Sequence, residues 1–103
     1  MILYSVTVNV DADINEEWLS WMQRVQIPKV IATGFFVEHK ILKLLTEVEN
    51  NGVTYSVQYY LNNMDAYNTY ANDHAPTLQK EHSLRYEGKF VAFRTLLEVL
   101  PNA

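Results

Sequence analysis

The chain has 103 residues, no cysteine and a net charge of −4, with acidic and basic residues mixed along its length. This length suits one domain, taken as residues 1–103. The lack of cysteine excludes disulfides and thiolate metal sites. The chain has no run of basic residues that would indicate nucleic acid or an anionic membrane as a partner. No apolar stretch approaches the roughly 20 residues of a membrane span, and the first residues alternate like a strand rather than forming a signal peptide, so we expect a cytoplasmic protein.

Residues 2–10 predict a strand. Apolar side chains occupy every second position from Tyr4 to Val10, and Ser5, Thr7 and Asn9 lie between them. This period of two is typical of a strand with two unlike faces.

A helix is expected after this strand. Asp13 or Asn15 could cap it, and apolar residues then recur at helical spacing from Trp18 onward. Pro28 should kink or interrupt this helix, because proline removes a backbone donor and clashes with the preceding turn. Gly34 is a plausible end. We expect Trp18 in the core and Trp21 at its rim.

Residues 35–48 predict a long second strand. Asn51-Gly52 follows it and precedes another alternating run, which favours a two-residue type I′ turn because both turn positions need positive φ. That turn sets a register with Asn50 opposite Val53, Val48 opposite Tyr55, Thr46 opposite Val57, Leu44 opposite Tyr59, and Leu42 opposite Leu61. On the other face it sets Glu49 opposite Thr54, Glu47 opposite Ser56, Leu45 opposite Gln58, and Lys43 opposite Tyr60.

A second helix is expected from Asn62 or Asn63 to about Tyr86, with Pro76 as an interior complication and Glu87-Gly88 as its end. Residues 90–99 alternate again and predict the last strand. One face of that strand carries Val91, Phe93, Leu97 and Val99, and the other carries Phe90, Ala92, Arg94 and Leu96.

The order of elements is βαββαβ, which in about 100 residues predicts an α+β, ferredoxin-like plait with an antiparallel sheet. Both helices should cover the more apolar sheet face, which we assign to Tyr4, Val6, Val8, Leu42, Leu44, Tyr55, Val57 and Tyr59. The second face would then carry Ser5, Thr7, Asn9, Lys43, Leu45, Ser56, Gln58, Tyr60, Arg94 and Leu96. This face is too polar for a core and more apolar than an ordinary surface. It indicates either a homodimer that pairs through its sheets into a barrel, or an open face with scattered apolar residues.

Three side chains of the second helix are weak candidates for catalysis. Counted at 100° per residue, His74 and His82 flank the stripe that should face the sheet, and Tyr86 follows at the helix end. A half-buried histidine near a tyrosine hydroxyl such as that of Tyr59 could transfer protons near neutral pH. The interpretation that we favour is hydrogen-bonded packing.

We predict no metal site and no cofactor. His74 and His82 are eight residues apart, about 12 Å along a helix, too far to share one ion. His39 could join them only through folding that the pattern does not reveal. The chain has no glycine-rich phosphate loop and no nucleophile elbow.

Arg94 is flanked by apolar residues in the last strand, where a charge is costly unless it is satisfied. Its guanidinium could bind a carboxylate or phosphate through two hydrogen bonds, or it could form an ion pair with Glu47 or with an acidic residue of a partner subunit. We favour the ion pair. The candidates for ligand contacts are Tyr59, His82 and Arg94.

Four stretches, residues 4–22, 26–36, 50–60 and 74–100, together resemble a family of short bacterial proteins known only as a domain of unknown function (four-two-eight-six in that series). This family is similar to the dimeric α/β-barrel superfamily. The resemblance implies ferredoxin-like subunits that pair through their sheets. That superfamily includes cofactor-independent monooxygenases of aromatic substrates, haem-degrading enzymes and ligand-sensing regulatory modules. It implies no catalytic residue for this chain.

From these observations we expect a small homodimer that binds a small organic ligand or acts in regulation, without catalysis, and that needs no nucleic acid or membrane partner. One alternative is a cofactor-independent monooxygenase that uses His74, His82, Tyr59 or Tyr86 in a cleft between helices and sheet. Another is a purely structural or interaction protein.

Overall fold

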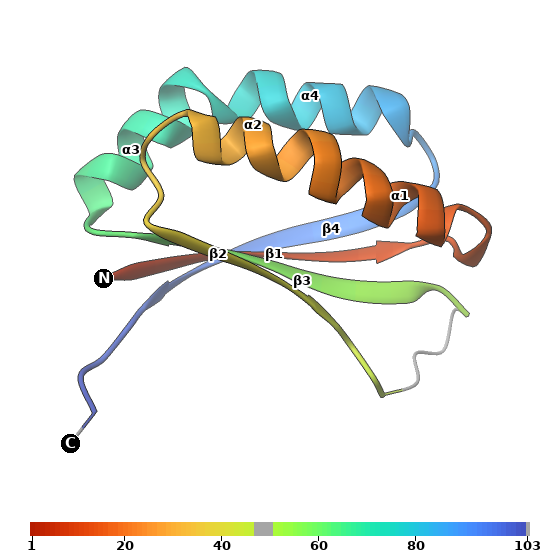
Figure 1. The fold of residues 1–103 in the computed structure, drawn as a ribbon, viewed down its shortest axis with the longest axis horizontal. Helices are drawn as coiled ribbons and strands as arrows, with labels where there is room; N and C mark the ends of the chain where they lie inside the picture. The colour runs from red at the N-terminus through yellow and green to blue at the C-terminus, as the bar shows by residue number, and fades with distance from the viewer. Residues whose placement is uncertain (47–50, 103) are drawn as a thin grey trace.

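A four-stranded antiparallel sheet carries a layer of helices on one of its faces (Figure 1). The computed structural model describes residues 1–46 and 51–102. The strands are β1 (Ile2–Val10), β2 (Glu38–Lys43), β3 (Val53–Leu61) and β4 (Phe90–Glu98). The helices are η1 (Ala12–Ile14), α1 (Asn15–Trp21), η2 (Met22–Gln26), α2 (Ile27–Ala32), α3 (Met64–Asp73) and α4 (Ala75–Arg85). The sheet order is β2-β3-β1-β4, which confirms the predicted ferredoxin-like plait.

The core lies between the central strands and the helices. Side chains from alternate positions of β1 and β3 are buried there, because every second residue of a strand points to the same face. They are Tyr4, Val8, Val10, Tyr55, Val57, Tyr59 and Leu61. Trp18 is fully buried against them and Trp21 is half-buried, as predicted. The covered face of β1 and β3 is therefore predicted correctly.

The first helix is interrupted just before Pro28. Its turn from Met22 to Gln26 is a π-helix, in which the Ile27 amide donates to the Met22 carbonyl. Pro28 then lies in the first turn of α2, which continues directly from the π-helical turn because Gln26 and Ile27 keep helical backbone angles. The predicted caps are wrong. A short 3₁₀ turn precedes α1, no side chain caps either segment, and Asn15 instead accepts a hydrogen bond from the Tyr55 hydroxyl.

The second helix is broken in two at His74. Asn63 caps α3 through a bond from the Ala66 amide to its Oδ1 (2.9 Å), as predicted. His74 leaves the helical conformation at φ −124° and ψ −41°, because Pro76 favours a helix start rather than an interior. The break changes the angles counted through it, but His74 is half-buried and its ring lies 6.3 Å from that of the buried Tyr70.

The predicted two-residue hairpin is also wrong. β2 ends at Lys43, and its register places Lys43 opposite Tyr55 and Ile41 opposite Val57. Asn51 has a φ of 59°, but Gly52 has no positive φ. Glycine is needed there for space, since a Cβ would lie 2.5 Å from the Asn9 Oδ1. The predicted partners at 47–50 lie outside the described residues.

The observed registers correct the predicted faces of both edge strands, β2 through its pairing with β3 and β4 through its pairing with β1. Opposed residues share a face, and Leu42 lies opposite Ser56, so Leu42 is on the open face and not on the covered one. Leu44 and Leu45 lie beyond β2 and are exposed, Leu45 at 91%. On β4, Arg94 lies opposite Val6 and Leu96 opposite Tyr4. Their assignment to the open face is therefore wrong. Lys43 likewise shares the face of Tyr55.

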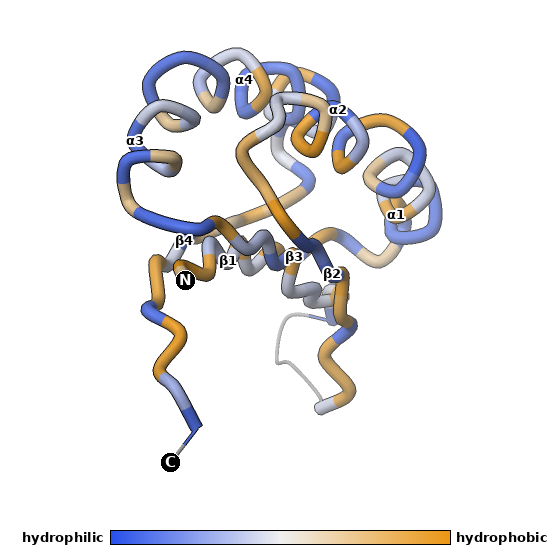
Figure 2. The backbone as a smooth tube through the Cα atoms, turned by 60° about the vertical axis from the view of Figure 1, so that its left-hand side comes forward, coloured by the Kyte–Doolittle hydropathy of each residue, from blue (hydrophilic) through white to orange (hydrophobic). Residues whose placement is uncertain are grey.

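The open face has a polar centre and an apolar margin. Ser5, Ser56 and Gln58 form side-chain hydrogen bonds along its middle. Along β4 the face exposes Val91 (67%), Phe93 (63%) and Leu97 (47%). The end of β2 and the chain after β4 both extend away from the helices on this side (Figure 1), and both are largely hydrophobic in Figure 2. Within the described part of the chain, no helix has the length and apolar character to cross a bilayer.

Candidate functional site

A cavity lies between the sheet and the helices, above β1, β3 and β4. Its lining is mostly apolar or aromatic. From the sheet come Tyr4, Val6, Val8, Val57, Tyr59, Phe90, Ala92 and Arg94, and from the helices come Met22, Gln26, Val30, Tyr70, Leu78, Gln79 and His82. The predicted candidates Tyr59, His82 and Arg94 are thus brought together, each from a different element.

The cavity is compact. Its free volume is about 50 Å³, about a third of the roughly 150 Å³ that holds one benzene molecule. A ligand with one ring would therefore have to displace wall side chains or leave part of itself at the cavity mouth.

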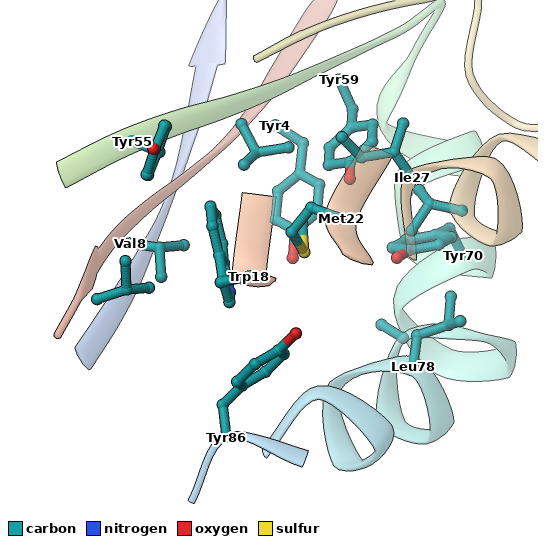
Figure 3. Close-up of a cluster of buried hydrophobic side chains, with 14 of the residues drawn as sticks. Tyr4, Val8, Trp18, Met22, Ile27, Tyr55, Tyr59, Tyr70, Leu78 and Tyr86 are labelled. Atoms are coloured by element: carbon teal, nitrogen blue, oxygen red, sulfur yellow. The ribbon is translucent and has the colours of Figure 1, made fainter. Parts of the chain in front are cut away.

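Three tyrosines converge at this cavity (Figure 3). The ring of Tyr4 lies 6.1 Å from the rings of both Tyr59 and Tyr70. Burial raises the pKa of Tyr59 far above its ordinary value, and Tyr70 and Tyr4 raise it further. Burial also raises the pKa of Tyr70. These phenols are protonated near neutral pH and can donate hydrogen bonds.

Arg94 gives the cavity a positive charge. Its side chain is exposed, which puts the guanidinium at the cavity mouth. Burial raises the pKa of Tyr4, and the nearby Arg94 opposes that rise. No described carboxylate forms an ion pair with Arg94, and none lines the cavity. The predicted partner Glu47 lies outside the described residues.

His82 is held as a neutral imidazole. The Trp18 indole Nε1 donates a hydrogen bond to the His82 Nε2 at 2.9 Å, so the ring proton lies on Nδ1. Burial lowers the pKa of His82 to about 4, and the charge of Arg94 lowers it further. His82 therefore offers a hydrogen-bond donor at neutral pH, while its proton-accepting nitrogen is already occupied.

This histidine should make stability depend on pH. Because its folded pKa lies below the unfolded value of about 6.5, the unfolded chain binds the extra proton. Stability is then complete above pH 6.5 and falls as the pH drops toward 4. After allowance for partial exposure we expect a loss of about 2 kcal/mol.

Urea unfolding at pH 7, 5.5 and 4 measures this loss. His82→Gln keeps an acceptor for Trp18 but does not titrate, so its stability should fall by about 2 kcal/mol less than that of the wild type. Equal losses in the two proteins would contradict the assignment of the neutral imidazole. Carboxylates such as Glu17 titrate in both proteins, so their contribution to the pH-dependent loss of stability is the same and cancels from the difference.

The other candidates lie outside the cavity. His74 packs against Phe35 and Tyr70, with ring centroids 5.6 and 6.3 Å away. The Tyr86 ring is buried, but its hydroxyl accepts a bond from the Arg85 Nε at 3.1 Å, and Arg85 pairs with Glu17 at 2.6 Å. His39 is exposed on β2. Within residues 1–46 and 51–102, no three His, Asp or Glu side chains are placed to hold a metal ion.

Sequence reasoning missed Gln26. This residue is buried, and its Nε2 donates to the Leu78 carbonyl at 3.1 Å. The sequence did contain an indication of its position. Met22, Gln26 and Val30 are spaced four residues apart and therefore lie on one stripe of the helix. A polar residue within an otherwise apolar stripe is informative. Tyr4, Tyr70 and Gln79 were missed as well, and no pattern separated them from ordinary core or surface residues.

Comparison with known proteins gives one family and a fold. Residues 1–100 match the family described as "Domain of unknown function (DUF4286)". No curated protein matches the chain.

Three solved structures illustrate the fold. The haem-degrader MhuD from Mycobacterium tuberculosis, with two haems bound, is 16% identical at a TM-score of 0.72, covering 100% of this chain and 99% of its own. A variant of SnoaB, a cofactor-independent oxygenase from Streptomyces nogalater, is 17% identical at 0.66, covering 98% and 95%. A dimeric ferredoxin-like protein from an uncultured marine organism is 15% identical at 0.67, covering 100% and 98%. Identities this low support the fold and leave function to the site itself.

Proposed function

The chain belongs to the DUF4286 family, a domain of unknown function, and from the geometry of its cavity we propose that it forms a homodimer that binds a small organic anion. The observation that carries this proposal is the guanidinium of Arg94 at a cavity that no carboxylate of the described residues lines. Arg94 is exposed at the cavity mouth, so its planar guanidinium is accessible to a ligand. Such a group binds a carboxylate through two parallel hydrogen bonds.

The rest of the lining supports an anion with an apolar body. Protonated tyrosines and the Nδ1–H of His82 are donors, which suit the oxygens of an anion. Val6, Val57 and Ala92 offer an apolar floor on the sheet. Ligand sites commonly combine such apolar walls with a few polar groups that fix orientation.

Dimerisation is proposed on the open sheet face. The apolar side chains exposed along β4, the hydrophobic end of β2 and the chain after β4 all lie on this side. Apolar margins of this kind mark interaction surfaces. A second copy of the same face would cover them and form a barrel between the two sheets. The dimeric ferredoxin-like protein of the same fold supports the proposal of a dimer.

An oxygenase has weaker support in this geometry. Proton abstraction from a substrate needs a free base, but the His82 Nε2 accepts the bond from Trp18 and burial keeps Tyr59 and Tyr70 protonated. We also propose a cytoplasmic location, for which the absence of cysteine is the supporting observation.

Calorimetric titration with benzoate and with benzyl alcohol tests the proposal. The two have similar shapes, but only benzoate is charged. Benzoate should bind once per protomer, at least about tenfold more tightly than benzyl alcohol, because hydrogen bonds to charged groups contribute roughly 1.5–3 kcal/mol. Equal affinities, or no binding of benzoate, would refute an anion site.

A further inference from the structure

Gln26 brings an unpaired hydrogen-bond acceptor to the wall of the cavity. It lies at the end of the π-helical turn η2 and lines the cavity beside Leu78. The bond from its Nε2 to the Leu78 carbonyl (3.1 Å) fixes the amide, because the opposite orientation would place two carbonyl oxygens against each other. The Oε1 of Gln26 is therefore the free end of the side chain.

This Oε1 has no hydrogen-bond partner. Gln26 is only 7% exposed, and among the buried side-chain atoms of the described residues only its Oε1 is unpaired. Leaving a buried acceptor unpaired has a real cost, and native proteins have few such atoms. Leucine or methionine would fill a helical core position without this cost. The amide thus points to a partner that is not part of the folded chain.

The local structure allows a ligand to reach this atom. Oε1 is covered in the unliganded protein, so a wall side chain must change rotamer before a donor approaches. Met22 lies four residues earlier and also lines the cavity, and its unbranched side chain adapts readily. π-Helical turns such as η2 occur often at functional sites.

We propose that the Gln26 Oε1 accepts a hydrogen bond from a hydroxyl group of the ligand, which makes the preferred ligand a hydroxylated one-ring carboxylate. This inference rests on the proposed function, because the carboxylate is the group that Arg94 would hold. A site with a buried acceptor discriminates strongly against an analogue that lacks the donor, since the acceptor then stays unpaired. Gln26 would act in specificity, and Arg94 in anion binding.

The test compares benzoate with its 2-, 3- and 4-hydroxy derivatives by calorimetric titration. The wild type should bind one of the three hydroxybenzoates at least about tenfold more tightly than benzoate. Gln26→Leu should lose the preference, so that its affinities for benzoate and for that hydroxybenzoate become similar. Gln26→Met gives the same comparison if the leucine variant does not fold. Gln23→Leu, an exposed position in the same turn, should leave the preference unchanged.

The outcomes separate the two proposals. Equal affinities of the wild type for benzoate and all three hydroxybenzoates would overturn the role of Gln26 and leave the anion site intact. A preference that persists in both Gln26 variants would overturn it as well. Failure of all four compounds to bind would overturn the anion site and this inference together.

Discussion

Arg94→Gln should weaken the binding of benzoate by roughly 10- to 100-fold, because the guanidinium is the positive charge at the cavity. Hydrogen bonds to charged groups contribute roughly 1.5–3 kcal/mol, and each 1.4 kcal/mol is a factor of about ten in affinity. The exposure of Arg94 places the expected loss nearer the lower limit. The affinity of Arg94→Lys for benzoate should lie between those of the wild type and Arg94→Gln, since lysine keeps the positive charge but lacks the planar guanidinium.

Lys80→Gln is the matched control for this experiment. It removes the same charge from an exposed position on α4, outside the lining of the cavity, so it should leave the Kd for benzoate unchanged. Circular dichroism establishes that each variant is folded. If Arg94→Gln binds benzoate as tightly as Lys80→Gln does, the positive charge of the cavity has no part in binding.

Phe93→Glu should convert the dimer to monomers. Phe93 is 63% exposed on the open face of β4, and a second sheet packed there would bury it in both subunits. A carboxylate buried without a partner costs several kcal/mol, and the symmetry of a homodimer would apply that cost twice. Light scattering after gel filtration should give twice 12.0 kDa for the wild type and 12.0 kDa for the variant.

Leu84→Glu is the control for Phe93→Glu. It tests whether loss of the dimer depends on the position of the new carboxylate rather than on the substitution itself. Leu84 is 67% exposed, similar to Phe93, but it lies on α4, on the other side of the molecule from the open face. Its mass in solution should equal that of the wild type. A wild type of 12.0 kDa, or a dimer that persists in Phe93→Glu, would argue against pairing through the sheets.

The order of the elements and the core of the central strands could be predicted, since both depend on local patterns. Alternation in residues 2–10 and 53–61 assigns faces without knowledge of tertiary structure. The edge strands could not be assigned in this way. Asn51-Gly52 indicated a tight turn, yet Gly52 is required by the approach of Asn9. The observed register of β2 against β3 differs from the predicted one by an odd number of residues, which moves Leu42 to the opposite face of the sheet.

The site was predictable only in part for a similar reason. Arg94 was a candidate because a charge flanked by apolar residues is unusual in any fold, and His82 because it lies on an amphipathic helix. The break at His74 reflects Pro76 near the start of α4, but the helical angles were counted through that proline as if the helix were continuous. The acceptor of Gln26 became meaningful only when the structure showed that Leu78 fixes its amide and that Oε1 has no partner.

Native mass spectrometry with benzoate is the decisive experiment, because one spectrum reports both the number of subunits and the bound ligand. We expect a dimer of twice 12.0 kDa with one benzoate per protomer, and an Arg94→Gln dimer that carries little or none. A monomer, or benzoate retained equally by the wild type and Arg94→Gln, would contradict the proposed function.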